Sequence, residues 1–295
     1  MESPLFWSDV YCEINQQSKV RSQYYFGLDV YNFEFIYQTN ESGIKSPGKA
    51  TFGGIWVTED EPTVSFYFSL FNSIFESLEL VGEIRVVLPP LYFFPSKFSK
   101  QAIALNLLGF EEIFLDVNFH IDIGKWTQDL LSKGNRKKIR QFNEYGGEIV
   151  LASSSDFLNA YHVLRMNREN RGVKISMDQD RFVENLVKLP GVYRTYLAKV
   201  GPDIVGVAYL VRISDEVNYV LFWGDDINFR HLSPVASLLN FLVSESRRDG
   251  CTILDLGISS VDGVVDVGLA RFKKNLGAVE TSKPVYHRSN QSDQA

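Results

Sequence analysis

The sequence is poor in the residues that build disulfide frameworks and metal centres. Its 295 residues include only two cysteines, Cys12 and Cys251, which lie far apart in the chain. A disulfide framework needs several cysteines at short spacings, so we expect both thiols to be buried and inert. No group of cysteines and histidines has the spacing of a zinc site, and the sequence therefore predicts no metal.

Long apolar runs and an excess of basic charge are missing as well. The apolar stretches are too short or too interrupted to span a bilayer. The first residues, MESPLFWSDV, lack the basic and apolar regions of a secretory signal, so we expect a cytoplasmic protein. The net charge of −6 argues against a protein whose main task is to grip nucleic acid, because that task needs a basic field.

The chain has an ordinary hydrophobic content, 45%, and a high aromatic content, 14%, which together indicate a globular protein with strand-rich cores. In the first half the patterns predict a helix over 4–17, two strands within 22–37, a loop over 39–50, a strand over 51–57, a helix over 63–80, a strand over 83–89, a helix over 98–108 and a strand over 111–123. In the second half they predict a helix over 131–145 capped by Ser132, a strand over 148–152, helices over 155–170 and 178–189, a three-strand meander over 192–223, a helix over 233–249, a strand over 251–257, a helix over 266–277 and a strand over 279–286.

The two halves resemble each other. Gly82 and Gly250 each end a helix and precede a strand, and Gly109 and Gly277 each end the following helix. Both pairs have the same separation, since 250 − 82 = 168 and 277 − 109 = 168. A shared offset at two helix ends indicates two copies of one α/β unit.

The repeat sets the expected domain limits. We predict an N-terminal domain over 1–125, a C-terminal domain over 126–288, and a polar tail over 289–295 that we expect to be disordered. In the C-terminal copy, the helix over 266–277 carries Phe272 and Lys273, where the N-terminal copy has Ala104 and Leu105. We therefore place the chemistry in the second copy and treat the first as a degenerate partner that binds substrate or packs.

The order of elements in the second half resembles the GNAT acyltransferase fold. With the tandem arrangement, the chain resembles the FemABX-like branch, whose members look like two GNAT-type domains in tandem. The segments that carry the resemblance are LSKGNRKKIR (131–140), RHLSPVASLL (230–239), DLG (255–257) and GLARFKKNLGA (268–278). The resemblance implies an α/β (α+β) fold in which each domain has a mixed, mostly antiparallel sheet flanked by helices.

The resemblance also implies transfer of an acyl group to an amine. The leading hypothesis is an N-acyltransferase that uses acyl-CoA. Its acceptor would be a small-molecule or carrier-linked amine, such as an amino sugar, in cell-envelope or surface-polysaccharide synthesis. One alternative is a Fem-type transferase that uses aminoacyl-tRNA on a cell-wall precursor, although the helical arm of the tRNA-using members is missing. Another is a non-catalytic GNAT-like binding module, because the loop over 229–236 lacks the glycines of the common pyrophosphate loop.

Three residues are the catalytic candidates. The Phe272–Lys273 pair lies in the most specific segment, and the Lys273 ammonium would stabilise negative charge on the reacting carbonyl. The alternative for Lys273 is a side chain that snorkels from a surface helix. Asp255, at the end of a strand, would act as general base or orient the acceptor amine, or would simply cap the following turn.

The candidates for donor binding surround the start of the helix over 233–249. Trp223 would pack against the pantetheine or sugar of the donor, and Arg230 would pair with a phosphate. Ser233 would cap the helix, whose N-terminal end favours an anion. Val235 and Ala236 follow in the same segment and complete the expected cofactor site.

Four further residues are candidates for binding the acceptor. Arg136 lies in the basic run over 133–140 and matches an arginine of the resembled branch; the alternative for this run is a solvated basic face. Asn167 and Arg171 end the first helix of the second copy, a region that touches the acceptor in the wider fold. Tyr219 lies on the strand before the donor loop, where core packing is the alternative.

Overall fold

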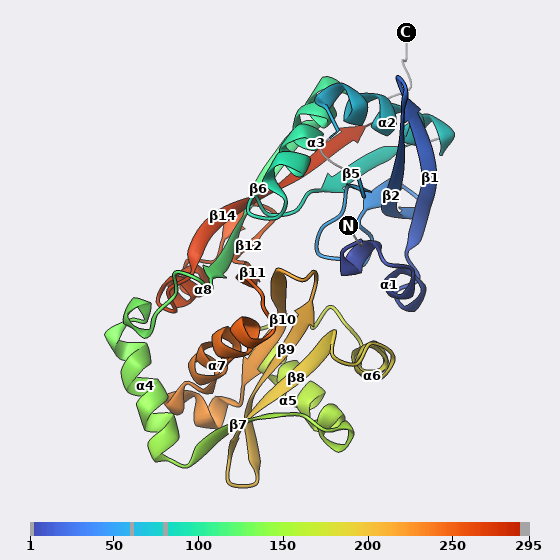
Figure 1. Ribbon diagram of the computed structural model, residues 1–295. Helices are drawn as coiled ribbons and strands as arrows, with labels where there is room; N and C mark the ends of the chain where they lie inside the picture. The colour runs from blue at the N-terminus through green and yellow to red at the C-terminus, as the bar shows by residue number, and fades with distance from the viewer. Residues whose placement is uncertain (1–2, 60–61, 79–81, 290–295) are drawn as a thin grey trace. The chain divides into compact units, whose positions relative to one another are not determined.

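The computed structural model describes residues 3–59, 62–78 and 82–289, and the chain divides into two compact units (Figure 1). Unit 1 contains the chain up to Asn118, the segment Ser260–Val265 and the chain from Thr281 onward, and unit 2 contains Phe119–Ser259 and Asp266–Glu280. These limits differ from the predicted contiguous domains 1–125 and 126–288, because two C-terminal segments belong to unit 1. Of the predicted tail over 289–295, Ser289 ends a strand, and the rest lies outside the described residues.

Unit 1 is a mixed sheet with two long helices. Its elements are the 3-10 helix η1 (Leu5–Trp7), α1 (Asp9–Ile14), β1 (Ser18–Phe26), β2 (Asp29–Asn40), β3 (Gly43–Ser46), β4 (Ile55–Val57), α2 (Val64–Ser77), β5 (Glu83–Val87), α3 (Pro95–Leu107), the first part of β6 (Glu111–Asp122), the hairpin β12 (Ser260–Val261) and β13 (Val264–Val265), and most of β14 (Val279–Ser289). The strand order is β1-β2-β3-β5-β14-β6, and β4 also pairs with β2. Aromatic side chains fill its core, among them Trp7, Trp56, Phe66 and Phe71, none of which is accessible to solvent.

Three predictions for unit 1 are corrected by the structure. The predicted helix over 4–17 is broken into η1 and α1, because Ser8 is extended and its side chain caps the second helix. The predicted loop over 39–50 contains β3, which pairs with β2 and β5 and buries Ile44. The predicted strand over 51–57 shortens to β4, and the end of the helix predicted over 63–80 falls partly outside the described residues.

Unit 2 has helices on both faces of its strands. Its elements are η2 (Gln128–Leu130), α4 (Lys133–Glu144), β7 (Gly147–Leu151), η3 (Ser154–Asp156), α5 (Phe157–Glu169), α6 (Gln179–Lys188), β8 (Tyr193–Val200), β9 (Asp203–Arg212), β10 (Val217–Asp225), η4 (Ile227–Leu232), α7 (Pro234–Arg248), β11 (Ile253–Ile258) and α8 (Val267–Lys274). The strand order is β6-β11-β10-β9-β8-β7, with the end of β6 in this unit. All the predicted elements from 131 to 286 exist, with ends that differ by a few residues.

Two glycines show how the helices cover this sheet. A Cβ atom on Gly224 of β10 would lie 2.8 Å from Cβ of Asn167, so α5 approaches β10 closely there. A Cβ atom on Gly206 of β9 would lie 3.0 Å from Pro234 at the start of α7. Gly206 pairs with Asp225, the neighbour of Gly224, and successive strand residues face opposite sides of a sheet. The helices α5 and α7 therefore cover opposite faces.

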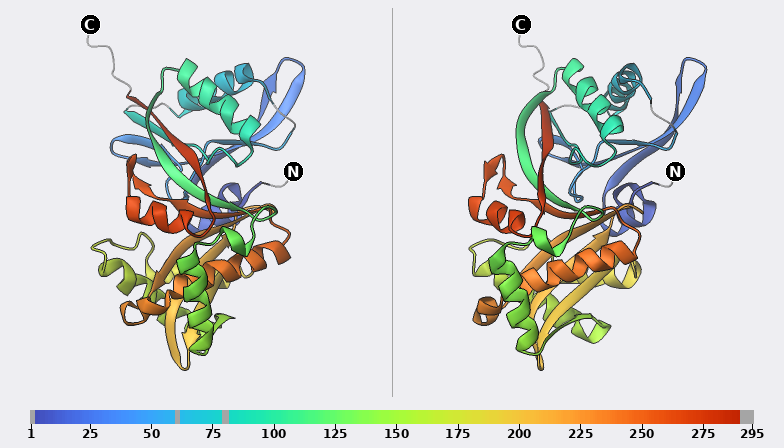
Figure 2. Two further views of the ribbon diagram at one scale, coloured as in Figure 1. Left: turned by 90° about the vertical axis from the view of Figure 1, so that its left-hand side faces the viewer. Right: turned by 60° about the vertical axis from the view of Figure 1, so that its left-hand side comes forward.

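The internal repeat is visible in the structure. The order α2-β5-α3-β6 recurs as α7-β11-α8-β14, and the last strands begin 279 − 111 = 168 residues apart, the offset found in the sequence. Gly109 and Gly277 have φ angles of +78° and +79°, the left-handed conformation that commonly ends a helix. The last strand of the second copy pairs with β5 and lies beside β6 in unit 1, so the second copy gives its final strand to the first (Figure 2).

The low cysteine content has the expected consequence. Cys12 and Cys251 are both buried and form no disulfide, and burial raises the pKa of each thiol to about 11.

Among the described residues, no group of histidine, cysteine, aspartate and glutamate side chains is placed to hold a metal ion. In the same part of the chain, no helix has the length and apolar character needed to cross a membrane.

The predicted cap of α4 supplies a first test. The Ser132 hydroxyl accepts a hydrogen bond from the backbone N–H of Asn135 at 3.2 Å, as the sequence predicted. Ser132→Ala should lower the free energy of unfolding by about 1 kcal/mol, because this N–H loses its partner. Urea unfolding measures the change, with Ser155→Ala, an exposed serine outside any cap position, as the control. Equal effects of the two substitutions would contradict the capping role.

Candidate active site

The central feature of unit 2 is an opening between two parallel strands. The pairing of β10 with β11 covers only Val217–Tyr219 opposite Ile253–Asp255, although β10 continues to Asp225 and β11 to Ile258. The register of β10 against β9 shifts between Val220 and Phe222, which marks a β-bulge at the point where the strands part. Alternate backbone N–H and C=O groups beyond the bulge therefore point towards an edge that β11 no longer covers.

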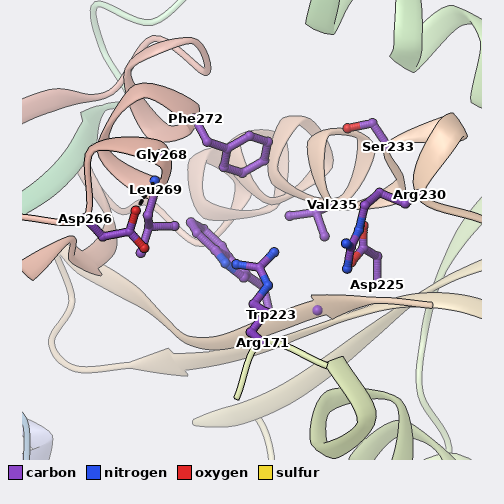
Figure 3. A pocket seen from close by; sticks show the side chains of 11 residues that line it. Arg171, Trp223, Asp225, Arg230, Ser233, Val235, Asp266, Gly268, Leu269 and Phe272 are labelled. Atoms are coloured by element: carbon purple, nitrogen blue, oxygen red, sulfur yellow. Dashed lines mark hydrogen bonds and ion pairs between the residues drawn. The ribbon is translucent and has the colours of Figure 1, made fainter. Parts of the chain in front are cut away.

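A cavity of about 410 Å³ lies at the far end of β10 (Figure 3). It is lined by Arg171, Trp223, Gly224, Asp225, Arg230, Ser233, Val235, Asp266, Gly268, Leu269 and Phe272. Its aromatic part is formed by the rings of Trp223 and Phe272, which meet edge to face with centroids 6.1 Å apart. The cavity therefore combines an apolar wall from α8 and β10 with polar groups from the start of α7 and the loop after α5.

Charged side chains at one side of the cavity are held in a fixed arrangement. The buried Asn167 donates from Nδ2 to Asp225 Oδ1 at 2.6 Å, and Arg230 Nη2 lies 3.3 Å from the same oxygen. Asp266, on the other side, accepts from the N–H of Leu269 at 2.9 Å and caps α8. Both carboxylates are thus engaged within the chain, and Arg171 reaches the cavity without an ion pair to any described residue.

The start of α7 differs from a simple capped helix. Ser233 lies at the N-cap position in the left-handed conformation, with φ of +51°, and its side chain makes no capping hydrogen bond. The prediction that the Ser233 hydroxyl caps this helix is therefore wrong. Pro234 has no N–H, Ser233 donates its N–H to Arg230 O, and Ala236 donates its N–H to Ser233 O, each at 3.0 Å. The helix start consequently lacks a run of free amides that would cradle a diphosphate.

Lys273 lies behind the cavity. It is the one buried residue of α8, all of which is described, with 1% of its surface exposed. Its Nζ donates to the carbonyl oxygens of Gly257 at 2.8 Å and Ile258 at 2.7 Å, and lies 5.5 Å from the centre of the Trp223 ring. Burial lowers the pKa of Lys273 to about 7, against the opposing effect of the Asp255 carboxylate. Such burial excludes a side chain that snorkels into solvent.

Comparison with known proteins identifies this half of the chain. Residues 132–274 match the family model of an acetyltransferase (GNAT) domain. This part of the chain is a GNAT domain by that match, and the chain as a whole shares its fold with FemX. No curated protein sequence is similar enough to count as a match.

Solved structures share the fold of the chain at low sequence identity. FemX has a TM-score of 0.70 at 13% identity, over 96% of this chain and 91% of that chain. L-PGS from Bacillus licheniformis has a TM-score of 0.61 at 13% identity, over 99% of this chain and 95% of that one. A tandem GNAT protein from the clavulanic acid biosynthesis pathway has a TM-score of 0.55 at 10% identity, over 94% of this chain and 85% of that one. The predicted α/β fold with tandem GNAT-like units is confirmed.

The GNAT domain brings half of the predicted site residues to the cavity. Those that line it are Arg171, Trp223, Arg230, Ser233, Val235 and Phe272. Lys273, Asp255, Ala236, Arg136, Asn167 and Tyr219 do not line it. Asp225 and Asp266 line it as well, although we did not predict them. Their signal in the sequence was their position, since Asp225 follows the expected strand that ends at 223 and Asp266 begins the expected helix over 266–277.

The predicted residues outside the cavity have identifiable structural contacts. The buried Asp255 accepts the N–H of Gly257 at 2.7 Å, which is the turn-capping alternative. Tyr219 is buried, with its hydroxyl 2.9 Å from the position that a Cβ atom on Gly257 would take. Arg136 is exposed on α4 and pairs with Asp129 at 3.2 Å. Ala236 is buried in α7.

Proposed function

We propose that this protein is an N-acyltransferase whose acyl donor binds in the unit 2 cavity and along the uncovered edge of β10. The parting of β10 and β11 beside this cavity is the observation that carries the proposal. A donor arm that contains amides can hydrogen-bond to the exposed edge of β10 as an additional strand would. The reacting carbonyl would then lie near the bulge, where an amine can reach it from the face that α5 covers.

Different residues of the cavity fit different parts of an acyl-CoA donor. Trp223, Val235 and Phe272 offer an apolar surface for the acyl and thioester region. At the start of α7, the guanidinium of Arg230 would take phosphate oxygens in place of the missing amide cradle. When bound, an acyl-CoA would supply an activated carbonyl group, and the residues of the cavity would hold that group in place.

Lys273 serves this arrangement as a positioning residue. Its two hydrogen bonds fix the carbonyl groups of Gly257 and Ile258 at the end of β11, and its ammonium group lies beside the Trp223 ring. Asp255 fixes the same turn through the N–H of Gly257. Together they hold β11 apart from β10, so that the edge of β10 stays open to the donor. Loss of such positioning typically lowers transfer rates by about 100-fold when the geometry shifts by about 1 Å.

A second candidate is transfer of an aminoacyl group from a charged tRNA. The absence of a free amide run at Ser233–Ala236 favours it, because the ester of an aminoacyl-tRNA does not require a diphosphate cradle at this point. In either case the acceptor is an amine, for which we propose an amino sugar or a cell-wall precursor in cell-envelope synthesis. The N-terminal copy would bind the acceptor or support the fold.

Binding measurements separate these candidates. Acetyl-CoA or a longer acyl-CoA at about 100 times its dissociation constant should stabilise the protein by about 2.7 kcal/mol, which raises the thermal unfolding midpoint. Trp223→Ala and Arg230→Ala should remove most of this rise, whereas Arg136→Ala on α4, outside the cavity, should keep it. A response to charged tRNA alone would favour the aminoacyl donor. No response to either donor, and no transfer to any amine, would favour a non-catalytic binding module.

A further inference from the structure

Two arginines, one in the last turn of α5 and one in the loop that follows it, have no assigned role in donor binding. Arg168 lies over the ring of Phe222 on β10, with its guanidinium carbon 5.9 Å from the ring centre, and is only partly exposed. Arg171, two residues past the end of α5, lines the cavity. Figure 3 shows Arg171 reaching into the cavity from the side opposite Phe272 and Ser233.

Neither guanidinium has a negatively charged partner among the described residues. The other arginine on this helix, Arg165, pairs with Glu169 at 3.7 Å, and Arg230 pairs with Asp225. For Arg168, burial and the like charge of Arg171 lower the pKa, and Tyr219 opposes them only in part. A half-buried cation beside a second cation is costly unless an anion joins them, although the C-terminal end of α5 offsets a share of the cost.

The position of the pair relative to the sheet indicates which ligand it serves. Phe222 and Gly224 point to the same face of β10, and the close approach of Asn167 to Gly224 shows that α5 covers that face. Trp223 points to the opposite face, where its ring meets Phe272 of α8. Arg168 therefore lies across the sheet from the aromatic wall of the donor cavity, on the side from which the acceptor would approach.

We propose that Arg168 and Arg171 bind an oxyanion of the acceptor, a carboxylate or a phosphate, close to its reacting amine. The planar fork of each guanidinium matches the two oxygens of such a group. An oxyanion between the two arginines would pair with both, which no negatively charged group of the described residues does. The acceptor is then an anionic amine; this identification rests on the proposed acyl transfer, whereas the anion site itself does not.

Thermal unfolding with simple anions tests the site without any transfer reaction. Inorganic phosphate and glutarate, each titrated at constant ionic strength against sodium chloride, serve as the phosphate and carboxylate probes. At least one of them should raise the unfolding midpoint of the wild type. Arg168→Met and Arg171→Met should each weaken that response at least tenfold, and Arg165→Met, on the same helix but paired with Glu169, should keep it. A response to one probe alone identifies the oxyanion.

The stability of the Arg168→Met variant without added anion separates an anion-binding role of Arg168 from a packing role. If Arg168 binds an anion, its charge is poorly compensated in the anion-free protein. In the absence of added anion, the Arg168→Met variant should then unfold at the same temperature as the wild type or higher, because this charge is removed. If Arg168 serves only to pack on Phe222, the variant should unfold at a lower temperature and keep the wild-type anion response, which would overturn the proposal. Absence of any anion response in the wild type would overturn it as well.

A kinetic measurement then links the site to the acceptor. With an active donor in hand, Arg168→Met should raise the KM for an amine that carries a carboxylate or phosphate at least tenfold. The KM for an uncharged amine should stay unchanged. Equal changes for both amines would contradict a role in recognising the anion, while the donor-binding experiments would stand unaffected.

Discussion

Replacing Lys273 by methionine should remove a rise in stability that the wild type shows between pH 7 and 8.5. The folded-state pKa of about 7 lies below the ordinary value of 10.5, so in this interval the unfolded state binds more protons than the native state. Stability then increases with pH, by up to about 1.4 kcal/mol per pH unit, or about 1–2 kcal/mol over the interval. Methionine does not titrate, and the variant should show a flat profile.

The interval ends at pH 8.5 because the two cysteines act in the opposite direction above it. Their folded-state pKa values of about 11 exceed the ordinary 9.0, so they lower stability as the pH rises past 9. Urea unfolding at three pH values measures the slope. Lys274→Met is the control, because Lys274 is exposed and pairs with Glu280 at 3.6 Å on the surface, and it should keep the wild-type rise. An unchanged slope in Lys273→Met would refute the assignment.

The same substitution should also weaken the fold at the upper end of this range. Without Nζ, the carbonyl oxygens of Gly257 and Ile258 lose their donor, and a buried unsatisfied group costs about 1–3 kcal/mol. We expect Lys273→Met to be about 2–4 kcal/mol less stable than the wild type at pH 8.5. Transfer should fall with it, and loss of the contacts at the end of β11 should weaken donor binding more than acceptor binding.

Replacing Gly257 by alanine should destabilise the protein by about 2–4 kcal/mol. Gly257 has φ of +74°, a conformation that costs a residue with a Cβ atom about 1–2 kcal/mol. The new Cβ atom would also lie 2.9 Å from the Tyr219 hydroxyl, so that the buried ring must move. The turn displaced by this movement holds the carbonyl that Lys273 binds, and we expect donor affinity to fall as well.

Two further variants separate the conformational cost from the clash. Gly250 has a similar φ of +80°, and a Cβ atom there meets nothing within 4 Å, so Gly250→Ala should cost only about 1–2 kcal/mol. Tyr219→Phe removes the oxygen that the new methyl group meets, and the double variant with Gly257→Ala should recover part of the loss. Equal costs at Gly250 and Gly257, with no rescue, would show that the Tyr219 contact is unimportant.

Much of the architecture was predictable from local patterns. The 168-residue offset between helix-ending glycines identified the repeat, because a left-handed residue at a helix end is a local requirement that glycine meets. The short strand β3 was not predictable, since four residues carry no periodicity and the strand exists through pairing with β2 and β5. The pairing of β14 within unit 1 was not predicted either, because the sequence of a strand does not indicate which neighbours it pairs with.

The candidate site was also predictable only where it depends on local sequence. Trp223, Arg230, Ser233 and Val235 lie within one stretch of chain, so the start of α7 brings them to one cavity. Lys273 follows Phe272 directly, yet one residue lines the cavity and the other is buried behind it. That difference depends on the carbonyl groups of Gly257 and Ile258, which lie 16 and 15 residues earlier. Contacts at such separations leave no mark in local periodicity.

The most direct test of the central claim is hydrogen–deuterium exchange with an acyl donor, either acetyl-CoA or a charged tRNA. The account predicts slower exchange in peptides that cover residues 220–236 and 266–272, the edge of β10, the start of α7 and the front of α8. Peptides from α3, the counterpart of α8 in the first copy, should exchange at an unchanged rate. Protection confined to unit 1, or no protection with either donor, would contradict a donor site in the GNAT domain.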